Sequence, residues 1–245
     1  MTAIGASVLT APVAPRCPAW RNRPTRLPIR RRSRIIGCAL LGSVIVWSGT
    51  AQAARDLSFE SAENVNEGAL NFLATLPARP VHHHQNRIRI DADSLISGWV
   101  HLAQCHDNLD AVPSAQITFR EGFVRDLKVG AFSLIENAWI EGATVQLRNI
   151  QPGARLCLSA QTRALRNSGN GFFNLTNGPY MRKFLDGYYP MRVTLDVTYP
   201  AQSLNLIDIS PPAQPGLAVV EQPGGIHIDT VFEGELQTLI QFQQN

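Results

Sequence analysis

From Arg87 to the end of the chain, apolar and polar residues alternate in short runs. Glycine, proline, asparagine and aspartate separate these runs, and the clearest of them is Val193–Tyr199. A period of two is that of strands with one buried face, and many such runs between turns are typical of an antiparallel sandwich or barrel. We therefore predict an all-β fold, an antiparallel β-sandwich. The expected strands are 87–91, 99–105, 117–119, 145–147, 156–160, 193–199, 226–228 and 236–242.

One stretch departs from this period. NGPYMRKFLDGYYP, residues 177–190, begins with Asn and a nearby Pro, continues with good helix formers, and ends at Gly187 and Pro190. These residues are start and stop signals for a helix of two turns. We predict one short helix near 179–186.

The aromatic residues of this stretch are Tyr180, Phe184, Tyr188 and Tyr189. On a short helix, Tyr180 and Phe184 would form one apolar patch with Leu185, and Tyr188 and Tyr189 would lie just beyond it. Such a patch can close an open end of the sandwich. Alternatively, it can form a ligand or partner surface, because tyrosine offers a large contact area at a low cost in conformational entropy.

The N-terminal region has a different composition. Residues 1–34 contain eight arginines and no acid, an apolar run of thirteen residues follows (Ile35–Trp47), and small residues lead to Ala53. These features are typical of a secretory signal peptide, so we predict that residues 1–53 form a signal helix that is cleaved after Ala53. A retained membrane anchor is less favoured, because thirteen helical residues span only about 20 Å of the roughly 30 Å hydrocarbon core.

Removal of the leader reverses the charge. The whole chain has 22 Lys and Arg and 19 Asp and Glu, or +3, and the leader holds eight of the bases and none of the acids; residues 54–245 therefore have 14 bases and 19 acids, or −5. A modestly acidic chain favours neither nucleic acid nor anionic lipid as a partner. We expect no stable membrane span after cleavage, an N-terminal arm at 54–80, and one β-sandwich domain at 81–245.

Only two cysteines, Cys105 and Cys157, remain after the leader. In an oxidising compartment two cysteines are expected to form a disulfide. In the chain-entropy model, closing a loop of about 50 residues stabilises a protein by roughly 4 kcal/mol. The alternative is a reactive thiol, since His101 and His106 lie near Cys105 in the sequence, but such a thiol needs a low pKa and partial exposure. We predict the disulfide.

VQLRNIQPGARLCLSAQ, residues 145–161, resembles the corner between strands E and F of fibronectin type III and related immunoglobulin-like sandwiches. The matching residues are Leu147, Ile150, Pro152 and Gly153. Leu156 replaces the usual corner tyrosine, and Leu158 stands where immunoglobulin domains have a core cysteine. The resemblance implies an immunoglobulin-like sandwich, and binding or scaffolding more than catalysis. It also implies that a bridge to Cys157 lies away from the usual inter-sheet position.

Three consecutive histidines, 82–84, precede the first alternating run. On an extended chain His82 and His84 share one face, and two such imidazoles can share a Cu(II), Ni(II) or Zn(II) ion. A turn near 93–97 would pair the flanking runs as a hairpin and bring residues 82–84 beside 106–108. His106 is then a third ligand and Asp107 a candidate fourth in a copper or zinc site. A solvated polar loop and a partner contact are the alternatives.

The sequence contains no Gly-rich phosphate loop, no Gly-x-Ser-x-Gly elbow and no His-Glu-x-x-His motif. We expect a binding or accessory protein without catalytic activity of its own, exported by a Sec-type signal peptide and either periplasmic or secreted. Its partner would be a protein or a small molecule of the periplasm or cell envelope, and no cofactor is indicated with certainty. The alternatives are a periplasmic copper- or zinc-binding protein that uses His82–His84, and a hydrolase with an unrecognised site.

Overall fold

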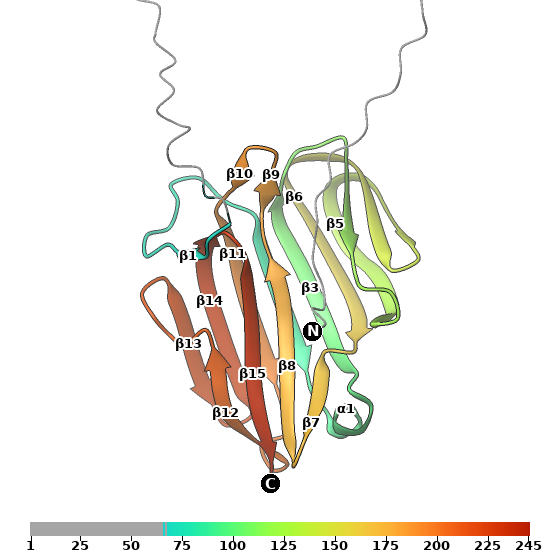
Figure 1. Ribbon diagram of the computed structural model, residues 1–245. Coiled ribbons are helices and arrows are strands. Elements are labelled where there is room, and N and C mark those ends of the chain that lie inside the picture. The colour runs from blue at the N-terminus through green and yellow to red at the C-terminus, as the bar shows by residue number, and fades with distance from the viewer. Residues whose placement is uncertain (1–65, 67) are drawn as a thin grey trace, which may run out of the picture. The chain divides into compact units, whose positions relative to one another are not determined.

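The described residues, 66 and 68–245 of the computed structural model, form two facing β-sheets, a separate small hairpin and one short helix (Figure 1). The predicted signal peptide, its cleavage site after Ala53, and the arm up to residue 65 lie outside these residues. In the part of the chain that is described, no helix has the length and apolarity needed to cross a membrane.

The larger sheet has nine strands. Its central path is β1 (Asn71–Phe72), β14 (Gly225–Glu233), β11 (Met191–Thr198), β2 (His83–Arg89), β3 (Val100–Leu109), β6 (Thr144–Thr162) and β4 (Ser114–Thr118), with β13 (Leu217–Gln222) on β14 and β5 (Val124–Glu141) on β6. All pairs are antiparallel except β2 with β11, which is parallel. The sheet is therefore mixed at one position, where we expected a wholly antiparallel one.

The smaller sheet has four strands in the order β12 (Leu204–Ser210), β15 (Leu236–Gln244), β8 (Phe172–Tyr180) and β7 (Leu165–Gly169). One core joins the two sheets: buried Leu195 and Ile228 of the larger sheet belong to the same cluster as Leu175, Ile240 and Phe242 of the smaller one. Full burial of each such side chain stabilises the fold by about 1.5–3 kcal/mol. The all-β sandwich prediction is confirmed.

The helix predicted near 179–186 is wrong. Strand β8 continues to Tyr180, which pairs with Leu236 of β15, and a hairpin of β9 (Lys183–Phe184) and β10 (Gly187–Tyr188) follows. Burial of an aromatic residue in the sheet outweighs helix propensity here, because an isolated helix of two turns has little stability of its own. Leu185 and Asp186 form the turn of this hairpin, and Gly187, with a φ of 139°, begins β10 opposite Phe184.

The helix that does form, α1 (Ala92–Ser97), lies where the sequence predicted a turn. Asp91 caps it through a reciprocal capping box with Ser94, and Gly98 ends it in the left-handed conformation at φ 77°. The helix connects β2 to β3 and leaves their pairing antiparallel, with His84 opposite His106. The predicted pairing of residues 82–84 with 106–108 is therefore confirmed.

The disulfide between Cys105 and Cys157 is present. The two residues are direct partners on β3 and β6, with their Cα atoms 4.1 Å apart. The bond therefore lies within the larger sheet and does not join the two sheets. Residues 145–161, which resemble an immunoglobulin-like corner, all belong to the single long strand β6; the family resemblance itself stays a prediction.

Candidate binding hollow and interior histidine cluster

Strands β2 and β3 present different chemistry on their two faces. Because successive side chains of a strand point to opposite sides, the paired residues His84 and His106 face the interior, whereas the paired residues Arg87 and Ala103 face outward. Each face holds a group of polar side chains. We call them the interior histidine cluster (His82, His84, Asn86, Gln104, His106 and Tyr180) and the outer hollow (Arg87, Arg89, His101, Asp126, Lys128, Ser159, Gln161, Asp196 and Thr198, together with the apolar residues Ile88, Leu102, Ala103 and Ala160).

Contacts at hydrogen-bond distance connect the side chains of the interior cluster. His82 Nε2 lies 3.0 Å from His106 Nδ1. The side-chain amide nitrogen of Gln104 lies 2.8 Å from His106 Nε2 and 2.7 Å from His84 Nε2. Since that amide carries two hydrogens, it can donate one to each ring. Gln104 therefore links the histidines of two adjacent strands.

These contacts extend to the smaller sheet through Asn86. Its carbonyl oxygen lies 3.0 Å from His84 Nε2, which donates to it only in the tautomer that does not accept from Gln104, and its amide donates to the hydroxyl of Tyr180 on β8. The Tyr180 ring also packs edge-on against His84, with centroids 4.9 Å apart. The cluster thus fixes β2 and β3 of the larger sheet against β8 of the smaller one.

Burial controls the protonation of the cluster. Loss of hydration lowers the pKa of His82 to about 4 and that of His84 to about 3, and the nearby positive charge of a protonated His82 lowers the pKa of His84 further. The same loss of hydration holds the pKa of His106 well below its usual value. A buried cation is costly without a counter-charge, so all three rings are neutral at neutral pH.

One position of the cluster is unsatisfied. His84 Nδ1 is buried and has no hydrogen-bond partner. Whichever nitrogen of His84 carries the proton, Nδ1 leaves either a donor or an acceptor unpaired. Such a group typically costs about 1–3 kcal/mol of stability.

The metal site predicted from the sequence is only partly assembled. His82, His84 and His106 do gather, but Asp107 does not join them: it lies on the opposite face of β3, where its carboxylate accepts a hydrogen bond of 2.7 Å from Arg155. Strand alternation explains this, because residue 107 must point away from residue 106. Within the described residues, no group of three or more His, Cys, Asp or Glu side chains is arranged to hold a metal ion.

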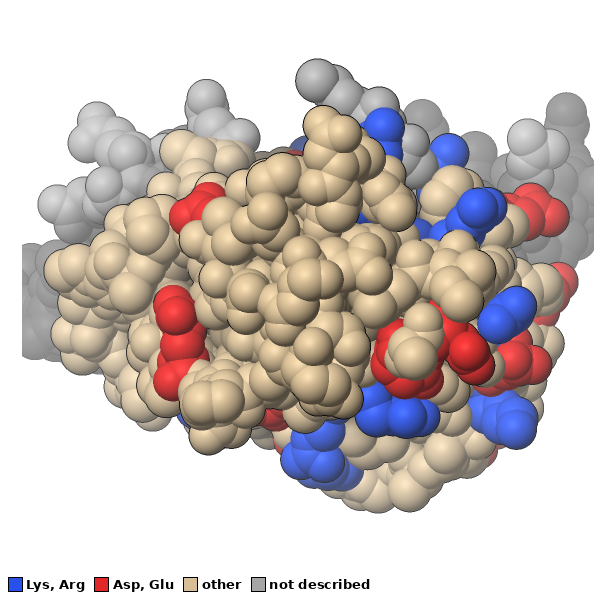
Figure 2. Space-filling view, turned by 90° about the horizontal axis from the view of Figure 1, so that it is seen from below, with Lys and Arg blue, Asp and Glu red and all other residues tan. Residues whose placement is uncertain are grey.

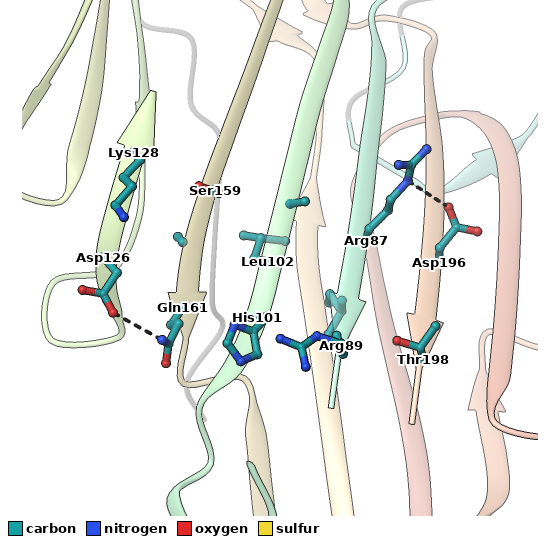
Figure 3. Close-up of a pocket in the computed structure, with 13 residues that line it drawn as sticks. Arg87, Arg89, His101, Leu102, Asp126, Lys128, Ser159, Gln161, Asp196 and Thr198 are labelled. Atoms are coloured by element: carbon teal, nitrogen blue, oxygen red, sulfur yellow. Dashed lines mark hydrogen bonds and ion pairs between the residues drawn. The ribbon is translucent and has the colours of Figure 1, made fainter. Parts of the chain in front are cut away.

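The outer hollow has a volume of about 770 Å³ and lies on the outward face of the larger sheet (Figure 3). Two small residues that are direct partners, Ala103 on β3 and Ser159 on β6, form the floor of the hollow. Their short side chains leave space above the sheet. Lys128 on β5 is the next neighbour of Ser159, and Arg87 on β2 is the next neighbour of Ala103. Long side chains therefore border a short floor on both sides.

A second row of side chains lies beside the first, nearer α1. It runs from Gln161 through His101 and Arg89 to Thr198, again as direct partners on adjacent strands. His101 is held in place by Asp91, the capping residue of α1, through a contact of 3.1 Å. Both rows therefore belong to a single rigid sheet.

The charged side chains at the α1 end of the sandwich are unevenly spread. Viewed from the end that carries α1 and the C-terminus, the basic side chains and most acidic ones lie toward the right, further acidic ones lie toward the left, and the middle of that end is uncharged (Figure 2).

The aromatic surface predicted from the sequence is divided. Tyr180 is buried in the interior cluster and is not part of a surface, which corrects its assignment. Phe184, Tyr188 and Tyr189 belong to the β9–β10 region, where Phe184 and Tyr189 pack edge to face at 5.4 Å. Arg182 packs over both rings and is held by Asp110 at 2.6 Å. This arrangement braces the hairpin.

Sequence reasoning did not identify the hollow. The alternation around Arg87 and Arg89 shows that both arginines share a face with His101, but periodicity alone does not reveal which strands lie beside β2 and β3. The small size of Ala103 and Ser159 was the available signal. It becomes meaningful only once the two residues are known to be neighbours.

Neither a protein-family model nor a curated protein matches this sequence. Among solved structures, a crystal structure of a "putative nutrient binding protein" from Legionella pneumophila is similar over 73% of this chain and 68% of its own, with 9% sequence identity and a TM-score of 0.35. A likeness this distant does not bear on the fold or the function of this chain.

Proposed function

We propose that this is an exported binding protein that holds a small ligand in the outer hollow and performs no chemistry on it. The observation that carries the proposal is the hollow of about 770 Å³ above the Ala103–Ser159 floor. Pockets for small molecules typically measure about 300–1,000 Å³. Strand-borne side chains on a sheet also form a preorganised site.

The contacts around the hollow favour binding over nucleophilic catalysis. A catalytic serine requires a base within hydrogen-bond reach. His101, the histidine that lines the hollow, is bonded to Asp91. Among the described contacts of the hollow, the hydroxyls of Ser159 and Thr198 have no hydrogen bond to a histidine.

Export is supported by two independent features. The leader has the arginine-rich, apolar and small-residue segments of a signal peptide. The bond between Cys105 and Cys157 belongs to an oxidising compartment, since cytosolic reductants keep such thiols reduced. Both features agree with a periplasmic location.

The binding proposal can be tested by filling the hollow. Isotope-labelled protein purified from the periplasm is titrated with a panel of sugars, amino acids, carboxylates and phosphates while its backbone amide signals are recorded by NMR. At least one class should shift the signals of Ala103 and Ser159. Ala103→Trp should abolish the shifts, because the indole occupies the floor.

Ala218→Trp is the matched control, since Ala218 is an exposed alanine on β13 of the same sheet. It should bind as the wild type does. Shifts that map to the β9–β10 hairpin, or a panel that shifts neither Ala103 nor Ser159, would reject the outer hollow as the binding site.

Metal binding by the interior cluster is a second candidate function. It is favoured by one observation: His82, His84 and His106 line a small cavity together with Met181 and Met191, whose thioethers are soft ligands suited to copper. In the present arrangement the ring nitrogens bond to one another and to Gln104. A metal ion would therefore have to displace the Gln104 side chain.

The test is the metal content of protein dialysed against Cu(I) or Zn(II) and then washed. Removal of all three histidines (His82, His84 and His106→Ala) should abolish retention, whereas His227→Ala on the outward face should not. Equal metal content in the two variants, or none in the wild type, rejects this function.

A further inference from the structure

We infer that the ligand of the outer hollow is a small organic anion, held through carboxylate or phosphate groups by Arg87, Arg89 and Lys128. The inference rests on the proposed binding function and adds the chemical class of the ligand. It follows from an imbalance between the donors and the acceptors that border the hollow.

The cationic side chains are scarcely engaged. The nearest carboxylate oxygen to Arg87 belongs to Asp196, 3.9 Å from Nε, and the nearest to Arg89 belongs to Asp91, 3.6 Å from Nη1. Both distances exceed that of a hydrogen bond. Lys128 has no ion pair or side-chain hydrogen bond among the described residues. The two guanidinium groups and the ammonium group thus keep their N–H donors for a ligand.

The acidic side chains, in contrast, already have partners. Asp196 is bonded to His227 at 2.6 Å, and Asp126 accepts a hydrogen bond of 3.3 Å from the Gln161 amide. Asp91, next to the hollow, is engaged by His101 at 3.1 Å. Asp126 and Asp196 therefore use part of their acceptor capacity on neighbouring donors, and the three cations that line the hollow (Arg87, Arg89 and Lys128) outnumber these two carboxylates.

The cations are placed on two sides of the floor. Lys128, Ser159, Ala103 and Arg87 occupy four adjacent strands in one register. At about 4.8 Å per strand, the backbones of Lys128 and Arg87 are roughly 14 Å apart. Their side chains can approach a compact anion from opposite sides.

Arg89 adds a third contact from the same side as Arg87. It follows Arg87 by two residues on β2, so the two arginines share the outward face about 7 Å apart along the strand. In Figure 3 the Arg89 side chain extends toward His101, at the edge of the hollow. Guanidinium groups grip carboxylate and phosphate with two parallel hydrogen bonds, which suits either anion.

Four probes distinguish the charge of the ligand from its shape: glucose, glucuronate, glucose 6-phosphate and citrate. Glucuronate adds a carboxylate to the glucose framework and glucose 6-phosphate adds a phosphate. We expect at least one anion to shift the amides of Ala103 and Ser159, and glucose to bind about tenfold or more weakly. The affinity should also fall as salt is raised, because these cations are exposed.

Single substitutions then identify the contacts. Arg87→Ala, Arg89→Ala and Lys128→Ala should each weaken binding of the anion about tenfold or more. Arg166→Ala is the matched control: it removes the same charge from an exposed arginine on β7 of the smaller sheet. It should leave the affinity unchanged.

The outcomes separate the two proposals. If glucose or another uncharged ligand binds over Ala103 as tightly as the anions, or if the three alanine variants behave like Arg166→Ala, the anion inference is overturned while the hollow stays a binding site. If no compound shifts Ala103 or Ser159, both proposals fail. Preference for glucuronate over glucose 6-phosphate, or the reverse, identifies the anionic group.

Discussion

On the inward face of β2 and β3, the residues His84, Gln104 and His106 are at most 3% exposed and bond to one another. On the outward face of the same strands, the side chains of Arg87 and Arg89 are 77% and 59% exposed, and their nearest carboxylates lie beyond hydrogen-bond distance. Strand alternation separates the two sets by a single step along the chain. Within one pair of strands, the polar side chains of the inward face are therefore buried and bonded to one another, and the arginines of the outward face are exposed to solvent.

The physical difference between the two faces is hydration. A polar group that leaves water must regain its hydrogen bonds inside the protein, and a missing partner costs about 1–3 kcal/mol. An exposed group keeps its water and loses little when a neighbour is removed. Changes on the inward face should therefore alter folding, and changes on the outward face should alter binding.

The largest expected effect is acid destabilisation through the inward face. The folded-state pKa values of His82 and His84 are lowered to about 4 and about 3, and that of His106 is also lowered. In the unfolded chain these histidines take up protons as the pH falls through about 6.5. Stability should thus be complete above about pH 6.5 and fall continuously toward pH 4, by up to about 1.4 kcal/mol per pH unit for each histidine.

Urea denaturation between pH 7.5 and 4.5, with EDTA present, measures this dependence. His83 adds to it in the same direction, because partial burial lowers its pKa as well. The carboxyl of Asp229, whose pKa is lowered chiefly by its hydrogen bond from Arg192, should act only at lower pH. A free energy of unfolding that stays constant from pH 7 to 5 would contradict the assignment of neutral, buried rings.

The second-largest loss of stability is expected from removal of the disulfide between Cys105 and Cys157, which lies on the outward face. Cys105 and Cys157 close a separation of 52 residues. Replacing both by alanine should reduce the free energy of unfolding by roughly 4 kcal/mol in the chain-entropy model. Chemical denaturation of the double variant under non-reducing conditions measures the loss. Because the bond joins strands already paired in one sheet, the ligand affinity of the folded variant should stay within about threefold of that of the wild type.

A smaller effect is expected from the centre of the interior cluster. Gln104→Leu keeps an apolar volume in place but leaves the Nε2 atoms of His84 and His106 without their amide donor. We expect a loss of about 2–3 kcal/mol by urea denaturation at pH 7.5. Gln85→Leu is the control, because Gln85 is half-buried on the outward face, one position from the inward residues. It should reduce the free energy of unfolding by less. Equal losses would mean that the interior hydrogen bonds are not what distinguishes the faces.

The sequence predicted those features that depend on parity and on short loops. Alternation correctly assigned His84 and His106 to one face, and the brief segment between β2 and β3 correctly predicted their antiparallel pairing. The same parity argument, applied strictly, excludes Asp107 from the cluster. Asp91 and Gly98 were also visible as capping signals for α1, although the segment was interpreted as a turn.

Long-range neighbours could not be predicted in this way. β11 lies beside β2, in parallel, although more than a hundred residues separate them in the chain, and periodicity carries no information about that choice. The outer hollow forms because Ser159 pairs with Ala103 on one side and with Lys128 on the other. Periodicity predicts neither pairing. The aromatic run around Phe184 failed as a helix for a related reason, because burial of Tyr180 against β15 determines its conformation.

Arg87→Ala is expected to have the smallest effect on stability. It should also distinguish the two faces most clearly, because it should change binding and not folding. The guanidinium makes one contact of 3.9 Å to Asp196, which has a closer partner in His227. Exposed pairs at such distances contribute between zero and about 1 kcal/mol, so the free energy of unfolding should change by less than about 0.5 kcal/mol. The same substitution should weaken ligand binding about tenfold. Gln104→Leu should give the opposite result, a marked loss of stability with the hollow unchanged. If Arg87→Ala were to destabilise the protein as much as Gln104→Leu, the outward arginines would have to be structural, and the division between the two faces of β2 and β3 would not hold.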